Sequence, residues 1–314
     1  MKHDFAVTSF LMLLFFCAQI VGLFLLKESI SEVKTGENGT ITVVYSEPIT
    51  GRPDLSGADS LTYIVAMIFI GTALLLALIK FRLFKIWKIW FFLAIGGALA
   101  ISFSVFLPEP VALGIGFFLA AWKILRPNIY IHNFCEIFMY GGIAIMLSPM
   151  FTVGWGILLL IIISIYDAIA VWKLKHMITL AKAQAEERIF AGLLIPYSRN
   201  KETKKETTEM PLPKKVVNKE IPHGFDDKEA KTAILGGGDI AFPMLFAGSV
   251  MTGLIEKGHT AFSSYLFSLL IPLFAGIALF LLLVKGEKDK FYPAMPFITA
   301  GCLAGYGLLL LFGL

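Results

Sequence analysis

The chain has 314 residues, of which 57% are hydrophobic and only 16% charged, and its mean hydropathy is +0.78. This composition excludes an ordinary water-soluble globular protein and predicts a chain that crosses a lipid bilayer several times. The net charge of +4 could suggest a nucleic-acid-binding protein, but the basic residues gather in loops between apolar stretches. We therefore expect a polytopic, all-α membrane protein with one membrane domain over residues 1–314 and no nucleic-acid partner.

Nine apolar stretches are predicted to form transmembrane helices, since about 20 apolar residues cross a hydrocarbon core of about 30 Å. The first stretch lacks a clear cleavage site for a signal peptide and is expected to be an anchor helix. The fourth stretch is the shortest. Six of the predicted helices lie within residues 5–172 and three within residues 233–314. In chain order they are Phe5–Leu26, Leu61–Ile79, Ile89–Phe106, Val111–Leu125, Ile129–Leu147, Val153–Trp172, Ala233–Leu254, Ala261–Val284 and Tyr292–Leu314.

Two polar segments separate these helices. Residues 27–60 form the first, in which the β-branched run Thr40–Tyr45 predicts a short strand. Residues 173–232 form the second, and its first part, as far as Ile189, has apolar residues at helical spacing. From Tyr197 to Lys231 the second segment is rich in Lys, Glu, Thr and Pro, so we expect a flexible linker.

The distribution of Lys and Arg predicts the orientation of the helices. If alternate loops face opposite sides, Lys27, Lys34, Arg52 and Lys257 lie on one side and the remaining 23 of the 27 basic residues on the other. Because basic residues favour the cytoplasmic side of a membrane, the amino terminus is expected in the cytoplasm and the carboxyl terminus outside. The linker would then be cytoplasmic.

Two aspartates occur inside predicted spans. An ionised carboxylate in hydrocarbon costs several kcal/mol, so an intramembrane aspartate indicates a functional site. Asp167 lies about five residues from the end of its span and Asp239 about six residues after Ala233. At about 1.5 Å of rise per residue, both lie about 8–9 Å inside the same membrane face. Pro243 follows Asp239 and has no N–H, so it should leave the Asp239 carbonyl without its helical partner.

Three short motifs resemble those of the presenilin and signal peptide peptidase family of intramembrane aspartyl proteases. The family's YD, GxGD and PAL motifs are similar to Tyr166-Asp167, Gly236-Gly237-Gly238-Asp239 and Pro293-Ala294-Met295-Pro296, in the same order and on the corresponding helices. The short loops are similar to those of microbial, archaeal-type homologues. Met295 replaces the usual leucine, which changes the side-chain volume little.

The resemblance implies a fold, an activity and a site. It implies a presenilin-like arrangement of nine helices and an intramembrane-cleaving aspartic endopeptidase that acts on transmembrane helices of other proteins and needs no cofactor. Asp167 and Asp239 would be catalytic, and the residues expected to support them or the substrate are Tyr166, Gly236, Gly238, Pro293, Ala294, Met295 and Pro296. Pro296 should also disfavour the helical conformation of Met295 and leave carbonyl groups free near the carboxylates.

Other functions stay open at this point. A transporter or leak channel could use the two aspartates as a proton or ion relay. Prepilin-type peptidases also use a GxGD aspartate, but they have fewer spans and no PAL-like motif. His132, Cys135 and Glu136 could suggest a metal site, but a fourth ligand is missing at a suitable spacing, so a satisfied polar contact and no metal are expected. The spacing of Gly301 and Gly305 favours close helix packing within the chain, although it leaves a homo-oligomer open.

Overall fold

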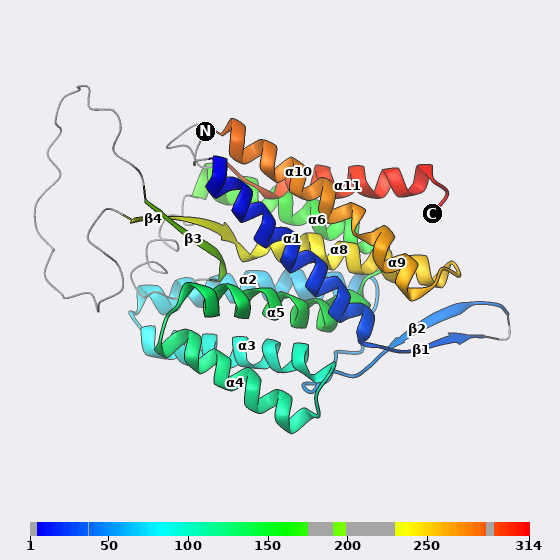
Figure 1. Ribbon diagram of the computed structural model, residues 1–314, viewed down its shortest axis with the longest axis horizontal. Coiled ribbons are helices and arrows are strands. Elements are labelled where there is room, and N and C mark those ends of the chain that lie inside the picture. The colour runs from blue at the N-terminus through cyan, green and yellow to red at the C-terminus, as the bar shows by residue number, and fades with distance from the viewer. Residues whose placement is uncertain (1–4, 37, 175–190, 199–229, 287–291) are drawn as a thin grey trace, which may run out of the picture.

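The computed structural model describes residues 5–36, 38–174, 191–198, 230–286 and 292–314. Helices dominate these residues and run back and forth along one common direction (Figure 1). The long helices are α1 (Phe5–Glu28), α2 (Ala58–Lys80), α3 (Phe84–Ser104), α4 (Glu109–Leu125), α5 (Ile129–Leu147), α6 (Val153–Ile169), α8 (Gly237–Glu256), α9 (Ala261–Ser268), α10 (Leu270–Lys285) and α11 (Met295–Leu311).

These helices correspond to the nine predicted spans. Seven stretches among the described residues are long and apolar enough to cross a membrane, and one of them is Ala261–Lys285, which contains both α9 and α10. Pro272 has no N–H and therefore cannot continue the hydrogen bonding of α9 into α10. The two remaining spans, α4 and α11, have 17 residues each. The protein is therefore an all-α, multi-pass membrane protein, as its sequence predicts.

Helix α8 lies at the centre of the bundle (Figure 1). It packs against α1, α5, α6 and α11, and 67% of its apolar window is buried inside the protein, compared with 11% for α2. A helix that is apolar all round and buried on every side belongs to the core of a bundle. Helix α2 instead lies at the outside of the bundle, with most of its surface exposed.

Two small antiparallel sheets lie at opposite ends of the bundle (Figure 1). Strand β1 (Ile30–Thr35) pairs with β2 (Ile41–Tyr45), which confirms the strand predicted near Thr40–Tyr45. Strand β3 (Gly192–Ser198) pairs with β4 (Ala230–Gly236) at the other end. The C-terminus lies at the end that carries β1 and β2, opposite to the N-terminal end of α1.

The predicted helix start at Ala233 is wrong, because β4 extends to Gly236 and α8 begins at Gly237. Ala233 and Leu235 are buried whereas Ile234 is exposed, and this alternation is that of a strand. Asp239 therefore lies in the first turn of α8 rather than about 8–9 Å along a helix.

The predicted linker is wrong at both ends, since Tyr197 belongs to β3 and Lys231 to β4. Its middle part, residues 199–229, lies outside the described residues. So does most of the segment with helical spacing, residues 175–190, which follows a π-helical turn at Ala170–Leu174.

Glycines let neighbouring helices approach one another closely. A Cβ atom at Gly301 of α11 would lie 2.6 Å from the backbone oxygen of Phe274 in α10, and one at Gly305 would lie 2.9 Å from that of Leu270. These distances are too short for non-bonded atoms, so only glycine fits. The predicted role of this glycine pair in helix packing within the chain is confirmed.

We expect Gly301→Ala to destabilise the protein by about 1–3 kcal/mol, because the added methyl group forces α10 and α11 apart. Gly307→Ala is the matched control, since a Cβ atom there meets nothing within 4 Å and gains the same helix propensity. Thermal unfolding of both variants in detergent measures the difference. Equal melting temperatures would show that α10 and α11 can move apart to fit the methyl group without loss of stability.

Candidate active site

Asp167 lies near the end of α6 and accepts a hydrogen bond from the start of another helix. The backbone N–H of Met295, the first residue of α11, donates to Asp167 Oδ2 over 3.1 Å. The first N–H groups of a helix have no acceptor within that helix, and no side chain of its own N-terminal segment caps α11. Asp167 is buried. Although it belongs to α6, it caps the N-terminus of α11.

Asp239 lies in the first turn of α8, directly after β4. Its carboxylate points back toward the strand, because Oδ2 lies 3.3 Å from the place where a Cβ atom of Gly236 would be. The start of a helix favours a negative charge, since the helix dipole is positive there.

Asp167 therefore lies where α6 ends and α11 begins, and Asp239 lies where α8 begins. These three helices pack against one another in pairs, so the site is enclosed by helix termini from distant parts of the chain. Two carboxyl groups in such a place can share one proton, which leaves one to act as a base and the other as an acid. Among the described residues, no group of three His, Cys, Asp or Glu side chains is suited to hold a metal ion.

The glycines before Asp239 differ in how closely they are packed. A Cβ atom at Gly237 would lie only 2.6 Å from the hydroxyl oxygen of Tyr140 in α5, whereas one at Gly238 would meet Phe242 at an ordinary 3.4 Å. Gly236 adopts an extended conformation that any residue can adopt. The closest packing is therefore at Gly237, the variable position of the motif, which was not among the predicted site residues.

A polar side chain in α1 supports the first turn of α8. Gln19 is fully buried, and its Nε2 donates to the carbonyl oxygen of Ile240 over 2.8 Å. Pro243 lies inside α8 and has no N–H to donate to the carbonyl of Asp239. The backbone around Asp239 thus depends partly on a side chain from another helix.

The segment Pro293-Ala294-Met295-Pro296 lies next to Asp167, as the motif comparison implies. Pro293 and Met295 are buried. The expectation that Met295 avoids the helical conformation is wrong, because α11 begins at this residue. The steric effect of Pro296 is a preference only, and proline itself is tolerated in the first turn of a helix.

Tyr166 lies apart from this hydrogen-bond arrangement. Its ring packs edge-on against Phe69 of α2, with 5.5 Å between the ring centroids. In the described structure it contributes to the contact between α2 and α6.

Two residues near the site were not predicted as members of it: Tyr140 and Glu136, both on α5. The hydroxyl of Tyr140 donates to Glu136 Oε2 and also contacts Gly237. The sequence signal was the presence of Glu136 inside an apolar span, which predicted a satisfied polar contact but did not reveal its partners.

Comparison with known proteins bears on the family and on the fold. Residues 40–313 match the family described as "Signal-peptide peptidase, presenilin aspartyl protease". No curated protein sequence matches significantly. A presenilin family intramembrane aspartate protease, solved in space group C222, shares the fold with a TM-score of 0.57 at 16% identity, over 95% of this chain and 94% of that one.

A structure described in the same words, in space group P2, gives a TM-score of 0.52 at 18% identity, over 95% of this chain and 96% of that one. At these identities the likeness concerns the fold alone. The family match, however, covers most of the chain and includes both aspartates. The chain belongs to the signal-peptide peptidase and presenilin family of aspartyl proteases.

Proposed function

We propose that this intramembrane aspartyl protease hydrolyses peptide bonds within transmembrane helices, with Asp167 and Asp239 as its catalytic pair. The observation that carries the proposal is the position of the two aspartates on helix ends that pack together: Asp167 accepts from the first residue of α11, and Asp239 lies in the first turn of α8. The residues around them contribute backbone N–H groups, glycines and apolar side chains.

The reaction needs an activated water molecule and a proton for the leaving nitrogen. The ionised member of the pair takes a proton from water, whose oxygen attacks the carbonyl carbon, while the protonated member donates its proton to the carbonyl oxygen. The carboxyl group that took the proton from water then donates it to the nitrogen, the other carboxylate takes back a proton from a hydroxyl of the tetrahedral intermediate, and the C–N bond breaks as the new carbonyl group forms. The two protons belong to the pair as a unit, so neither aspartate is assigned as the base.

A substrate helix must unwind before this reaction, because its peptide groups are hydrogen-bonded to one another. Each unpaired backbone group in lipid costs several kcal/mol, so the unwound segment needs new partners. An exposed strand edge can supply them by pairing with the substrate as an additional strand.

Strand β4 has such an edge. The outward backbone groups of β3, those of Gly192 and Leu194, are bonded to side chains of α5. The alternate residues of β3 therefore face β4, and in the observed register they pair with Leu235 and Ala233. Within the described part of the chain, this leaves both backbone groups of Ile234 and the N–H of Gly236 on the far edge of β4, since the carbonyl of Gly236, the N-cap residue, belongs to the first turn of α8. A substrate paired there would extend toward Asp239, three residues after Gly236.

The proposed orientation places the amino terminus in the cytoplasm and the carboxyl terminus outside. The distribution of Lys and Arg supports it. The N-terminal end of α1 and the C-terminus lie at opposite ends of the bundle in Figure 1, which is consistent with an odd number of spans. The catalytic pair would then lie near the cytoplasmic face.

We expect Asp167→Asn and Asp239→Asn each to reduce cleavage of a transmembrane reporter by at least roughly 10²-fold, because each removes the shared proton. Both variants should remain folded, since the asparagine oxygen at position 167 can still accept from Met295. Purified protein in liposomes and a thermal melt of each variant test this. Substantial activity in either variant would exclude the pair, and Asp239-dependent solute flux without any cleavage would favour a transporter.

The Pro293–Pro296 segment should depend more on its backbone than on its side chains. Pro293→Ala restores an N–H and lets α11 extend, which displaces the Met295 N–H from Asp167, so we expect a loss of roughly 10²-fold. Met295→Leu keeps the backbone and nearly the same volume and should remain close to normal. Reporter cleavage by the two variants, each with its melting temperature, decides the point; equal activities would mean that this segment only begins a helix.

The proposed orientation predicts the site of cleavage. Cuts should fall in the cytoplasmic half of the substrate helix, and substrates with their amino terminus outside should be preferred. Paired reporters of opposite topology, with products identified by mass spectrometry, measure both. Preferential cleavage of the inverted reporter would refute the orientation.

A further inference from the structure

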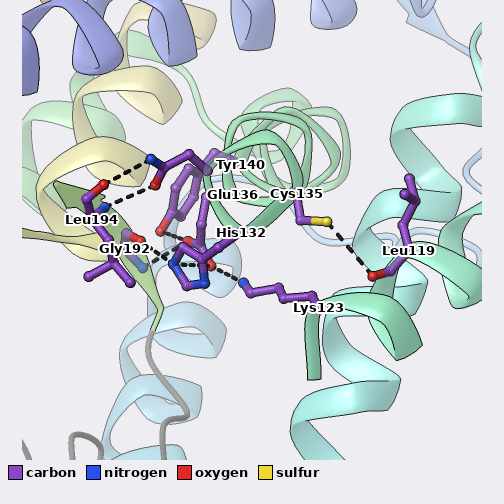
Figure 2. Close-up of polar contacts among 9 residues, drawn as sticks. Leu119, Lys123, His132, Cys135, Glu136, Tyr140, Gly192 and Leu194 are labelled. Atoms are coloured by element: carbon purple, nitrogen blue, oxygen red, sulfur yellow. Dashed lines mark hydrogen bonds and ion pairs between the residues drawn. The ribbon is translucent and has the colours of Figure 1, made fainter. Parts of the chain in front are cut away.

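A buried charged cluster lies beside the catalytic region and takes no part in the chemistry described above. Lys123 of α4 forms an ion pair with Glu136 Oε1 of α5, and the two side chains are only 3% and 0% exposed. Glu136 Oε2 accepts from the hydroxyl of Tyr140 and from the backbone N–H of Gly192. Figure 2 shows these groups converging on one carboxylate.

Stability alone is a poor explanation for this cluster. A buried ion pair gains little over apolar residues of the same volume, because removing two charges from water is costly. Helices α4 and α5 also have other contacts, such as that of Cys135 with the carbonyl of Leu119. The carboxylate therefore needs another explanation, and its contact with Gly192 supplies one.

On the edge of β3 that faces away from β4, side chains of α5 bond every backbone N–H and C=O group of the first three residues. Glu136 accepts the N–H of Gly192 over 2.8 Å, and His132 Nε2 donates to the carbonyl oxygen of Gly192 over 2.8 Å. Asn133 accepts from the N–H of Leu194 and donates to its carbonyl oxygen, both over 2.9 Å. These bonds fix the position of β3 along the axis of α5. They also orient β3 so that its other edge faces β4.

The same carboxylate also reaches the segment before Asp239 by two routes. Gly192 lies opposite Gly236 in the sheet, and the N–H of Gly237 donates to the carbonyl oxygen of Ala191 over 3.3 Å. The hydroxyl of Tyr140, held by Glu136, packs against Gly237. Glu136 thus holds both the strand that pairs with β4 and the tyrosine that packs against the start of α8.

We propose that Glu136, held in place by Lys123, is a positioning residue for proteolysis: it fixes β3, β4 and the Gly236–Gly237 turn so that Asp239 and the free edge of β4 are aligned with Asp167. This inference rests on the proposed function. It assigns the charged cluster to the alignment of the catalytic site rather than to overall stability.

Two neutral double variants test this without leaving a buried charge unpaired. Lys123→Met with Glu136→Gln keeps one oxygen that can accept from Gly192 and Tyr140, whereas Lys123→Met with Glu136→Leu has none. We expect the glutamine variant to lose less than tenfold in kcat, and the leucine variant to lose roughly 10²-fold, as misplacement of catalytic groups by about 1 Å does. Thermal melts should be similar.

Hydrogen exchange supplies a readout that does not depend on activity. In the leucine variant the amides of Gly192 and Leu194 and of Gly236–Asp239 should exchange faster, while the glutamine variant should keep their protection. If the wild-type protein cleaves no reporter, the proposed function fails, and the exchange data alone then decide whether Glu136 anchors the strand and the turn.

Tyr140→Phe gives a second test with a matched control. It removes one hydroxyl that joins Glu136 to Gly237 and should lower kcat about tenfold at an unchanged melting temperature. Tyr265→Phe removes a part-buried hydroxyl that donates to the carbonyl oxygen of Ile20. Tyr265 lies in α9, whose main neighbours are α8, α1 and α10 rather than β3 or β4, so this change should leave kcat unchanged. Equal activity and exchange in the two double variants would overturn the proposal, as would losses that simply follow the melting temperatures.

Discussion

The hydrogen bond between Met295 and Asp167 joins two of the three helix ends on which the site depends, those of α6 and α11. A helix that begins at membrane depth has N–H groups that neither water nor its own chain can satisfy. In α11 a carboxylate from α6 accepts one of them. This bond orients Asp167 and fixes the start of α11 next to it, and the first turn of α8, which carries Asp239, belongs to a helix that packs against both.

The same constraint explains other polar residues within the bundle. Backbone groups at a strand edge or near a proline are bonded by side chains of distant helices. Asn133 bonds both backbone groups of Leu194 at the edge of β3. Gln19 donates to the carbonyl oxygen of Ile240, close to Pro243. At the opposite end, Arg52 donates to the carbonyl oxygens of Ile145 and Met146, at the end of α5. A few buried side chains thus make irregular backbone possible inside an apolar protein.

Much of this architecture could be predicted from the sequence, because hydropathy reports where helices cross a bilayer. It correctly located nine spans and placed Asp167 and Asp239 in the spans that carry them. It failed at Ala233, because a buried strand followed directly by a buried helix forms one continuous apolar run. Strand β3 was missed for a related reason: its acceptors and donors are side chains of α5, about 60 residues away, such as His132 and Asn133.

The charged cluster shows the second limit of sequence reasoning. Glu136 and Lys123 are recognisable as charges inside apolar spans, and a polar contact for Glu136 was predicted. Which groups it contacts depends on the packing of α4 against α5 and on the position of β3, and neither follows from local patterns. Position 237 shows the same limit. It requires glycine because Tyr140 packs against it, not because of its own backbone conformation.

The free edge of β4 has a consequence for selectivity. Every residue except proline offers the same N–H and C=O groups, so an edge that pairs with backbone cannot distinguish one side chain from another. On the proposed mechanism, discrimination between substrates falls instead on the cost of melting each helix. A glycine lowers that cost by about 1 kcal/mol relative to alanine, which corresponds to roughly a fivefold change in the unwound population. Susceptibility to this protease would then be a property of the target's own local stability.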